Sequence, residues 1–137
     1  MRPYFSEQTR VFIAQRAGFC CEYCRLHRDD LFLPFQIDHI ISLKHGGGHE
    51  LENLAYVCPH CNQHKGSDLA TFLDSYQDIA VLFNPRTDIW AEHFEVAEGE
   101  ILPKTRTGRA TIKMLRFNEP DLLILRRSLF EEGRYPR

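Results

Sequence analysis

The chain of 137 residues, with 43% hydrophobic and 26% charged side chains, has the length and composition of one globular domain. This composition excludes a globally disordered chain, a collagen and a coiled coil. No apolar run reaches the roughly 18 to 20 residues that span a bilayer, and the chain does not open with a basic stretch followed by an apolar one. We therefore expect a single domain over residues 1–137, cytoplasmic and with no membrane partner.

The net charge of -2 argues against a protein that coats polyanions without selectivity. That total conceals an asymmetry, because residues 66–100 carry one basic and eight acidic side chains, whereas residues 101–137 carry nine and four. A basic segment that follows an acidic one is compatible with nucleic-acid contact through one face. It is equally compatible with two surfaces that attract each other, and the sequence leaves both interpretations open.

The first half of the chain predicts the order helix, strand, loop, strand, helix. Ser6 is a plausible N-cap for a helix over residues 6–17, which a glycine would end. The pattern of apolar residues predicts a strand over residues 35–41, which enters a loop with three consecutive glycines. A second strand is expected over residues 53–57, and a short helix over residues 60–65 follows it.

The second half gives weaker signals. Ser67 and Asp68 predict the cap of a helix that runs to about Tyr76. Beyond residue 80 we expect a hairpin around Ala97-Glu98-Gly99, with strands over residues 90–96 and 100–102, then a helix over residues 107–115 and a last helix from Asn118 to Gly133. Together these elements predict an α+β fold, with an N-terminal helix and a mixed hairpin and helical C-terminal extension.

Four of the five cysteines form two equal pairs, Cys21-x2-Cys24 and Cys58-x2-Cys61. Two such turns can complete a closed tetrahedral zinc site with four sulfur ligands, which leaves no open coordination position and is structural. Cys20 could replace Cys21 in a Cys20-x3-Cys24 pair, but the equal gaps favour Cys21. Thiol redox chemistry is the alternative, and it is weaker because a reduced cytoplasm and a matching second pair both favour metal binding.

Between the cysteine pairs, Asp38 and His39 combine a hard oxygen ligand with a group that can act as a general base. Neighbours in an ideal strand point to opposite faces, so both can serve one site where the strand ends, bends or bulges. On the following helix, Asn62 and Lys65 lie about 60° apart on one face, whereas His64 lies about 160° from Asn62. Asn62 could offer an oxygen to a cation, and Lys65 could bind a phosphate.

The order of these motifs resembles the zinc-containing HNH endonucleases, of a bacterial or phage type with a C-terminal extension. The residues that carry the resemblance are Cys21-x2-Cys24, Asp38-His39-Ile40-Ile41, Gly46-Gly47, Glu52-Asn53-Leu54 and Cys58-x2-Cys61-Asn62-x2-Lys65-Gly66. The resemblance implies a ββα-metal nuclease core over about residues 16–68, clamped by the zinc site, and it leaves an extension over about residues 69–137. This core would cleave phosphodiester bonds of DNA or RNA with one catalytic divalent cation.

The resemblance also implies roles for single residues. His39 would be the general base, and Asn53 would brace the loop that holds it. Asp38 would bind the catalytic cation together with Asn62, which stands where the family often has a histidine. Because the ligands are oxygen atoms, magnesium is the first choice of cation, and manganese or nickel could substitute. His45 and His49, which flank the three glycines, are expected to be solvent-exposed loop residues.

The leading hypothesis is therefore a metal-dependent HNH endonuclease that hydrolyses DNA. The alternative is a catalytically silent, zinc-stabilised module of the same fold that binds nucleic acid. Basic side chains of the C-terminal extension could grip phosphates or form a solvated helix face. These side chains are Lys104, Arg106, Arg109, Lys113, Arg116, Arg126 and Arg127.

Overall fold

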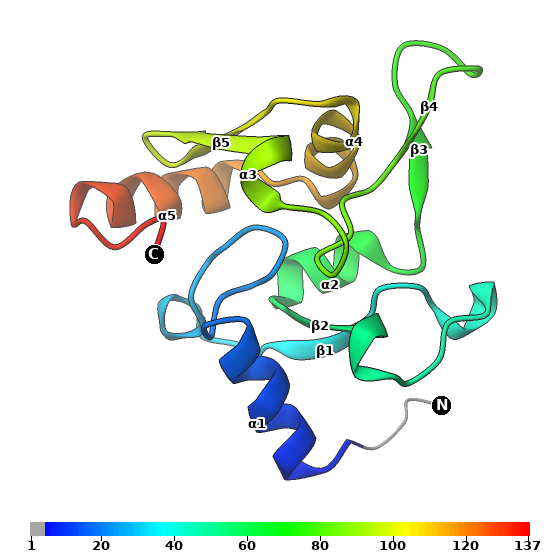
Figure 1. Ribbon diagram of the computed structural model, residues 1–137. Helices are drawn as coiled ribbons and strands as arrows, with labels where there is room; N and C mark the ends of the chain where they lie inside the picture. The colour runs from blue at the N-terminus through cyan, green and yellow to red at the C-terminus, as the bar shows by residue number, and fades with distance from the viewer. Residues whose placement is uncertain (1–4) are drawn as a thin grey trace.

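The computed structural model describes residues 5–137 and has the α+β architecture that the sequence predicts (Figure 1). Within this range the strands form three separate two-stranded antiparallel sheets. No helix among the described residues is long and apolar enough to cross a membrane. The helices are α1 (Glu7–Arg16), α2 (Pro59–Lys65), α3 (Trp90–His93), α4 (Arg106–Leu115) and α5 (Pro120–Glu131). The strands are β1 (Gln36–His39), β2 (Leu54–Val57), β3 (Ala70–Phe72), β4 (Ile79–Val81), β5 (Phe94–Ala97) and β6 (Glu100–Pro103).

The N-terminal helix α1 forms within a residue of its expected bounds. The hydroxyl of Ser6 accepts a hydrogen bond from the backbone N–H of Thr9 at 3.1 Å, which caps the first turn. At the other end, the guanidinium of Arg16 donates to the carbonyl of Leu54 at 2.6 Å. This bond ties the end of α1 to the start of β2, so the helix lies beside the central hairpin (Figure 1).

The central hairpin and helix form the ββα unit that the sequence predicts. β1 and β2 pair with His39 opposite Leu54 and Gln36 opposite Val57. Every residue of β2 is buried, whereas β1 is half-buried, so β2 faces the core on both sides. Helix α2 follows β2 at once, because Cys58 is its N-cap and the next residue is a proline, which suits the first helical position.

The helix expected from Ser67 to about Tyr76 is wrong. Residues 70–72 instead form β3, which pairs with β4 as a short hairpin. The turn between them is closed locally, because the Asp78 carboxylate accepts from the N–H of Asp74 at 3.2 Å. Side chains of α4 hold both strands of the hairpin next to the turn, since Lys113 donates to the Phe72 carbonyl and Arg106 donates to the Ile79 carbonyl at 3.2 Å. These tertiary contacts override the local capping signal.

The expected C-terminal hairpin and helices are present, with one change. β5 and β6 pair around Glu98-Gly99, and α4 and α5 begin close to their expected residues. The first four residues of the expected strand over 90–96 form the helical turn α3 instead. α4 packs closely here, because a Cβ atom on Gly108 would lie 2.2 Å from the carbonyl oxygen of His93. Only a residue without a side chain permits that approach.

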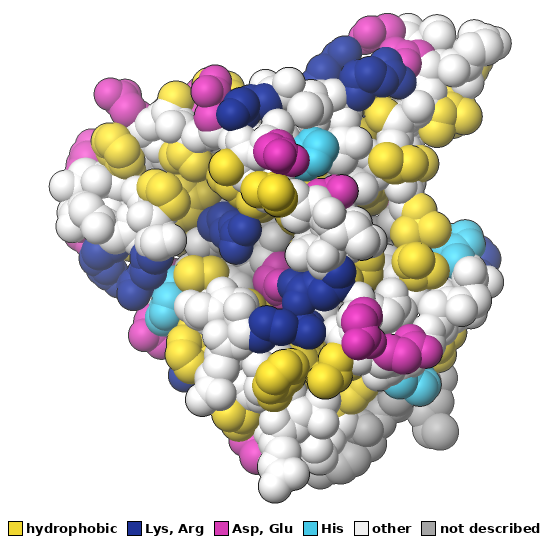
Figure 2. All heavy atoms as spheres, viewed as in Figure 1, with side chains coloured by type: hydrophobic (Ala, Val, Ile, Leu, Met, Phe, Trp, Pro, Cys, Tyr) yellow, Lys and Arg dark blue, Asp and Glu magenta, His cyan; other side chains and the backbone are white. Residues whose placement is uncertain are grey.

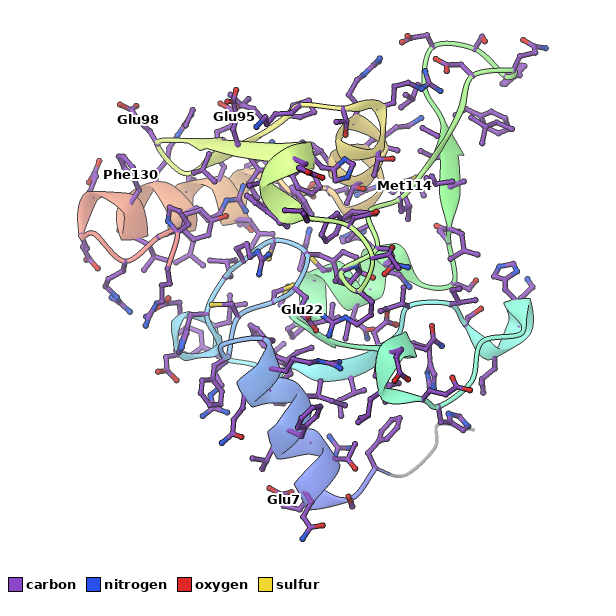
Figure 3. The ribbon with its side chains drawn as sticks, viewed as in Figure 1. Glu7, Glu22, Glu95, Glu98, Met114 and Phe130 are labelled. Atoms are coloured by element: carbon purple, nitrogen blue, oxygen red, sulfur yellow. The ribbon has the colours of Figure 1, made fainter. Side chains whose placement is uncertain are left out.

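The C-terminal extension packs against the loop that follows α1. The carboxylate of Glu22 is 7% exposed, forms an ion pair with Arg86 and accepts from the N–H of Tyr56 at 2.7 Å. Figure 3 shows Glu22 in the middle of the molecule, between α1 and the extension. Trp90 donates to the carbonyl of Tyr23 at 2.7 Å, and buried side chains of both parts belong to one hydrophobic cluster. The extension therefore contributes to the same core as the ββα unit.

We predict that Tyr135→Phe lowers the free energy of unfolding by about 1–2 kcal/mol. The buried Tyr135 hydroxyl donates to the carbonyl of Cys24 at 2.8 Å, and the substitution leaves that acceptor without this donor. Urea unfolding measures the change. Tyr76→Phe is the matched control, because Tyr76 is 83% exposed and its substitution should change stability by less than about 0.5 kcal/mol. Equal stability of the two variants would contradict the prediction.

Candidate functional site

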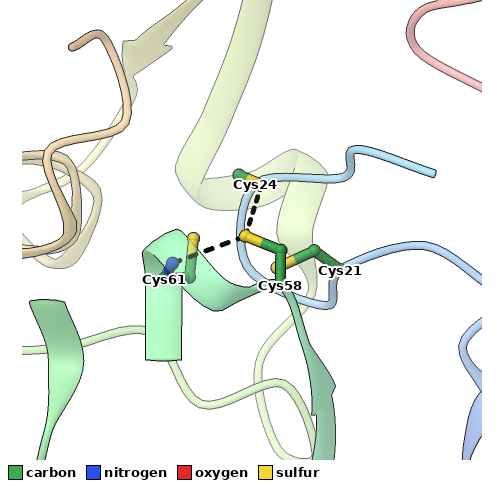
Figure 4. Close-up of side chains that lie close together, drawn as sticks. All are labelled: Cys21, Cys24, Cys58 and Cys61. Atoms are coloured by element: carbon green, nitrogen blue, oxygen red, sulfur yellow. Dashed lines mark hydrogen bonds between the residues drawn. The ribbon is translucent and has the colours of Figure 1, made fainter. Parts of the chain in front are cut away.

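The four paired cysteines meet at one point (Figure 4). Cys21 and Cys24 lie in the loop after α1, and Cys58 and Cys61 lie at the start of α2. All four are buried, and their sulfur atoms lie within 4.8 Å of one another. The sulfur atoms of Cys24 and Cys58 are 3.7 Å apart. Since Zn–S bonds are about 2.3 Å long, neighbouring sulfurs of a tetrahedral site are about 3.8 Å apart, so the cluster fits a zinc ion.

Cys20 lies outside this cluster, which selects Cys21 as the first ligand. Burial and the neighbouring sulfurs of Cys21 and Cys24 raise the pKa of the Cys61 thiol well above its usual range. A bound metal ion would compensate the charge of four adjacent thiolates. Four sulfur ligands would close the coordination, so a metal held here would be structural.

We predict that Cys58→Ser loses zinc and unfolds or aggregates, because structural zinc contributes directly to folding free energy. Zinc content by mass spectrometry and thermal unfolding by circular dichroism measure the two effects. Cys20→Ala is the matched control, since Cys20 is also buried but lies outside the cluster, and it should retain one zinc ion per chain. A folded Cys58→Ser protein without zinc would refute the clamp.

A second group of functional side chains gathers where β1 meets α2. β1 ends at His39, so Asp38 and His39 can both face one site, as expected for the end of a strand. They line a cavity of about 510 Å³ together with Asn62 of α2. The remaining lining residues are Phe5, Arg10, Pro34, Phe35, Gln36, Ile37 and Leu43. Asp38 and Asn62, which are 24 residues apart in the sequence, thus line one open cavity.

His39 lines this cavity, and its surroundings favour the neutral imidazole. Its Nε2 lies 2.9 Å from Nδ1 of His49. Partial burial, followed by the neighbouring His49, lowers the pKa of His39 below its ordinary value, and the opposing effect of Asp38 does not reverse this. A neutral imidazole has the lone pair that a general base requires near neutral pH.

Asp38 is paired with Lys65. The ammonium group lies 2.9 Å from the Asp38 carboxylate and 3.2 Å from the backbone carbonyl of His39, and the side chain of Lys65 is 2% exposed. The ammonium is therefore engaged within the protein, and the phosphate contact expected for Lys65 would require this ion pair to open. The lysine instead compensates the half-buried carboxylate and holds the end of β1 against α2.

Asn62 and Lys65 both face β1, in agreement with their calculated positions on the helix. The amide nitrogen of Asn62 donates to Oε1 of Gln36 at 2.6 Å. His64 lies on another face, where its ring packs against His60 with centroids 4.4 Å apart. His64 is therefore not part of the cavity, and Gln36 is a partner of the site that the sequence analysis did not identify.

Asn53 holds the loop between β1 and β2 in shape. Its side-chain oxygen accepts from the N–H of Ile41 at 2.9 Å, and its nitrogen donates to the carbonyls of Ile41 and Gly48 at 2.8 and 2.9 Å. The loop is tight here, because a Cβ atom on Gly47 would lie 1.8 Å from the carbonyl oxygen of Ile41. Gly47 thus permits close packing of the loop backbone against Ile41.

His49 is exposed, as expected, but its ring also contacts His39, with centroids 5.0 Å apart. The sequence analysis did not identify this contact. No periodic pattern links two histidines that are ten residues apart across a loop, and the contact depends on how the loop closes.

Two ion pairs join the acidic and basic segments of the C-terminal extension. Arg109 pairs with Asp74 at 2.9 Å, and this pairing lowers the pKa of Asp74. Arg106 pairs with Asp78 in the same hairpin. Figure 2 shows basic and acidic side chains next to one another in the region of the projecting β3–β4 hairpin. Attraction between the acidic and basic segments is therefore the interpretation that these four residues support.

Arg126 also departs from the expectation of an exposed phosphate contact. It is fully buried, and its guanidinium donates to the carbonyl of Gly99 at 2.6 Å and to Asn118 at 2.7 Å. A side chain enclosed in this way cannot reach a nucleic acid. Its role is to join α5 to the β5–β6 turn.

Comparison with known families identifies the ββα unit. Residues 21–68 match the model of a family described as HNH endonuclease. No curated protein and no solved structure matches the chain. The matched span begins at the first cysteine ligand and ends three residues after α2, so it contains both cysteine pairs and Asp38, His39 and Asn62 of the cavity. Residues 21–68 are therefore similar to the HNH endonuclease family, and the four-cysteine cluster fits a zinc-binding member of that family.

Proposed function

We propose that the protein is a metal-dependent endonuclease that hydrolyses phosphodiester bonds of DNA. The observation that carries this proposal is that Asp38, His39 and Asn62 line one cavity and lie in the segment that matches the HNH endonuclease family. A module that merely binds nucleic acid has no need to bring a carboxylate, a neutral imidazole and an amide together. We also propose that residues 1–137 act as one domain, because the C-terminal extension shares its hydrophobic cluster with the ββα unit.

Asp38 and Asn62 would hold the catalytic cation, for which magnesium is the first choice and manganese or nickel a substitute. The donor set fits a hard cation, because both side chains offer oxygen atoms. Asn62 uses its amide nitrogen for the bond to Gln36, which leaves its oxygen as the ligand atom. When bound, the cation acts as a Lewis acid that stabilises negative charge on the phosphate.

His39 would accept a proton from the attacking water. Its lowered pKa keeps the imidazole neutral before the reaction, and Asp38 beside it favours the imidazolium that forms afterwards. Asn53 would keep the loop beside His39 in one shape through its bonds to Ile41 and Gly48. By the family resemblance, the products would carry 5′-phosphate and 3′-hydroxyl ends.

We predict that His39→Ala reduces cleavage of supercoiled plasmid by at least about 100-fold, because general base catalysis typically contributes that much. Purified protein is incubated with plasmid and magnesium or manganese, and nicked and linear products are measured on a gel. EDTA should abolish cleavage by the wild type. His64→Ala is the matched control on the same domain and should cleave like the wild type, because His64 lies away from the cavity.

Equal cleavage by His39→Ala and the wild type would contradict the role of His39. Wild-type protein with a full complement of zinc that binds the plasmid and leaves it intact would favour the silent nucleic-acid-binding module. RNA and plasmid tested in parallel separate the two possible substrates of the domain.

A further inference from the structure

The ring of His49 is placed to control the ring of His39. Nδ1 of His49 lies 2.9 Å from Nε2 of His39, which is the length of a hydrogen bond. The two rings are inclined by 61°, so they meet edge to face rather than stacking. Phe5 borders both rings, with centroids 6.1 Å from His39 and 6.4 Å from His49. The two histidine rings therefore form a hydrogen-bonded contact, with Phe5 as an apolar neighbour of both.

The position of His49 is set by the loop itself. The side chain of Asn53 donates to the carbonyl of Gly48, the residue immediately before His49, at 2.9 Å. Gly47 lets the loop approach Ile41 so closely that a Cβ atom would overlap its carbonyl. These contacts anchor the backbone on the N-terminal side of His49, so His49 faces the end of β1 without a large entropic cost.

The direction of the hydrogen bond decides which nitrogen of His39 can act as the base. A neutral imidazole carries one N–H and one lone pair. If Nδ1 of His49 donated, Nε2 of His39 would accept, its Nδ1 would carry the hydrogen, and no lone pair would remain for water. If Nε2 of His39 donates, its Nδ1 keeps the lone pair. The second arrangement alone is compatible with a general base, and it persists after His39 accepts a proton.

We propose that His49 is a positioning residue that fixes the tautomer and orientation of His39, with the hydrogen on Nε2 and the base function on Nδ1. This inference rests on the proposed nuclease function and adds a residue to it. His49 acts through His39 and does not itself touch the substrate. In other enzymes, a carboxylate or a backbone carbonyl accepts a hydrogen bond from the catalytic histidine and orients it. Nδ1 of His49 would be that acceptor here.

The first test compares four substitutions in the plasmid assay. His49→Ala should lower kcat by about tenfold to 100-fold, since it removes a hydrogen bond to a group that becomes charged. KM for DNA and zinc content should not change. His49→Asn should restore most of the activity, because its side-chain oxygen is as many bonds from Cα as Nδ1 is. His49→Gln should restore less, since its oxygen lies one bond further out.

His45→Ala is the matched control. His45 is an exposed histidine on the other side of the same three glycines, and it does not line the cavity. It should cleave like the wild type. A loss of activity in His45→Ala as large as that in His49→Ala would show a general effect of the loop and would overturn the inference.

The second test reads the tautomer without cleavage. Nitrogen-15 NMR of the imidazole in zinc-loaded protein without other divalent ions distinguishes a ring nitrogen that carries a hydrogen from one with a lone pair. In the wild type and in His49→Asn, His39 should carry the hydrogen on Nε2. In His49→Ala, both tautomers of His39 should be populated. A hydrogen on Nδ1 of His39 in the wild type would overturn the inference.

The two tests separate this inference from the function on which it rests. Wild-type cleavage together with an equal or faster rate in His49→Ala would overturn the role of His49 alone, and a faster rate would mean that His49 blocks the base. A wild-type protein that cleaves no nucleic acid would overturn the proposed function and the catalytic role of His49 with it. The NMR result would then still report the direction of the hydrogen bond.

Discussion

The convergence of four sulfur atoms on one point is the constraint on which the rest of the structure depends. It joins the loop after α1 to the first turn of α2, although 33 residues lie between Cys24 and Cys58. Because Cys58 is also the N-cap of α2, the direction of the helix is fixed at the cluster. β1 pairs antiparallel with β2, and the end of β1 lies against α2. The cavity between β1 and α2 therefore lies on the same helix as the cysteine cluster.

The C-terminal extension also holds the loop that carries the first cysteine pair. Tyr135 and Trp90 donate to backbone carbonyls of the loop that carries the first cysteine pair, and Glu22 of that loop pairs with Arg86. The carbonyls of Cys24 and Tyr23 in this loop need hydrogen-bond donors, and the extension supplies them. Within the extension, Arg109 and Arg106 of α4 pair with Asp74 and Asp78 of the β3–β4 hairpin.

Sequence reasoning succeeded where the determinants are local. The two CxxC turns, the helix around Asn62 and the helices α4 and α5 follow from spacing, caps and periodicity, and the structure contains them. It failed where distant side chains decide. Residues 70–72 form a strand because α4 holds the hairpin, and Lys65 is buried because Asp38 lies opposite it. The contact of His49 with His39 depends on the closure of the loop, which no spacing in the sequence reveals.

Different parts of α2 contribute to the cysteine cluster and to the cavity. The first turn of the helix carries cysteines, whose tetrahedral geometry leaves little freedom, whereas Asn62 and Lys65 further along face β1 through single hydrogen bonds and an ion pair. Apolar side chains such as Phe5 and Phe35 also line the cavity, but each of its polar groups has a polar partner as well. Asp38 is paired with Lys65, Asn62 with Gln36, and His39 with His49. If His39 is the general base, as we propose, the chemistry would depend on the orientation of one imidazole and therefore on His49.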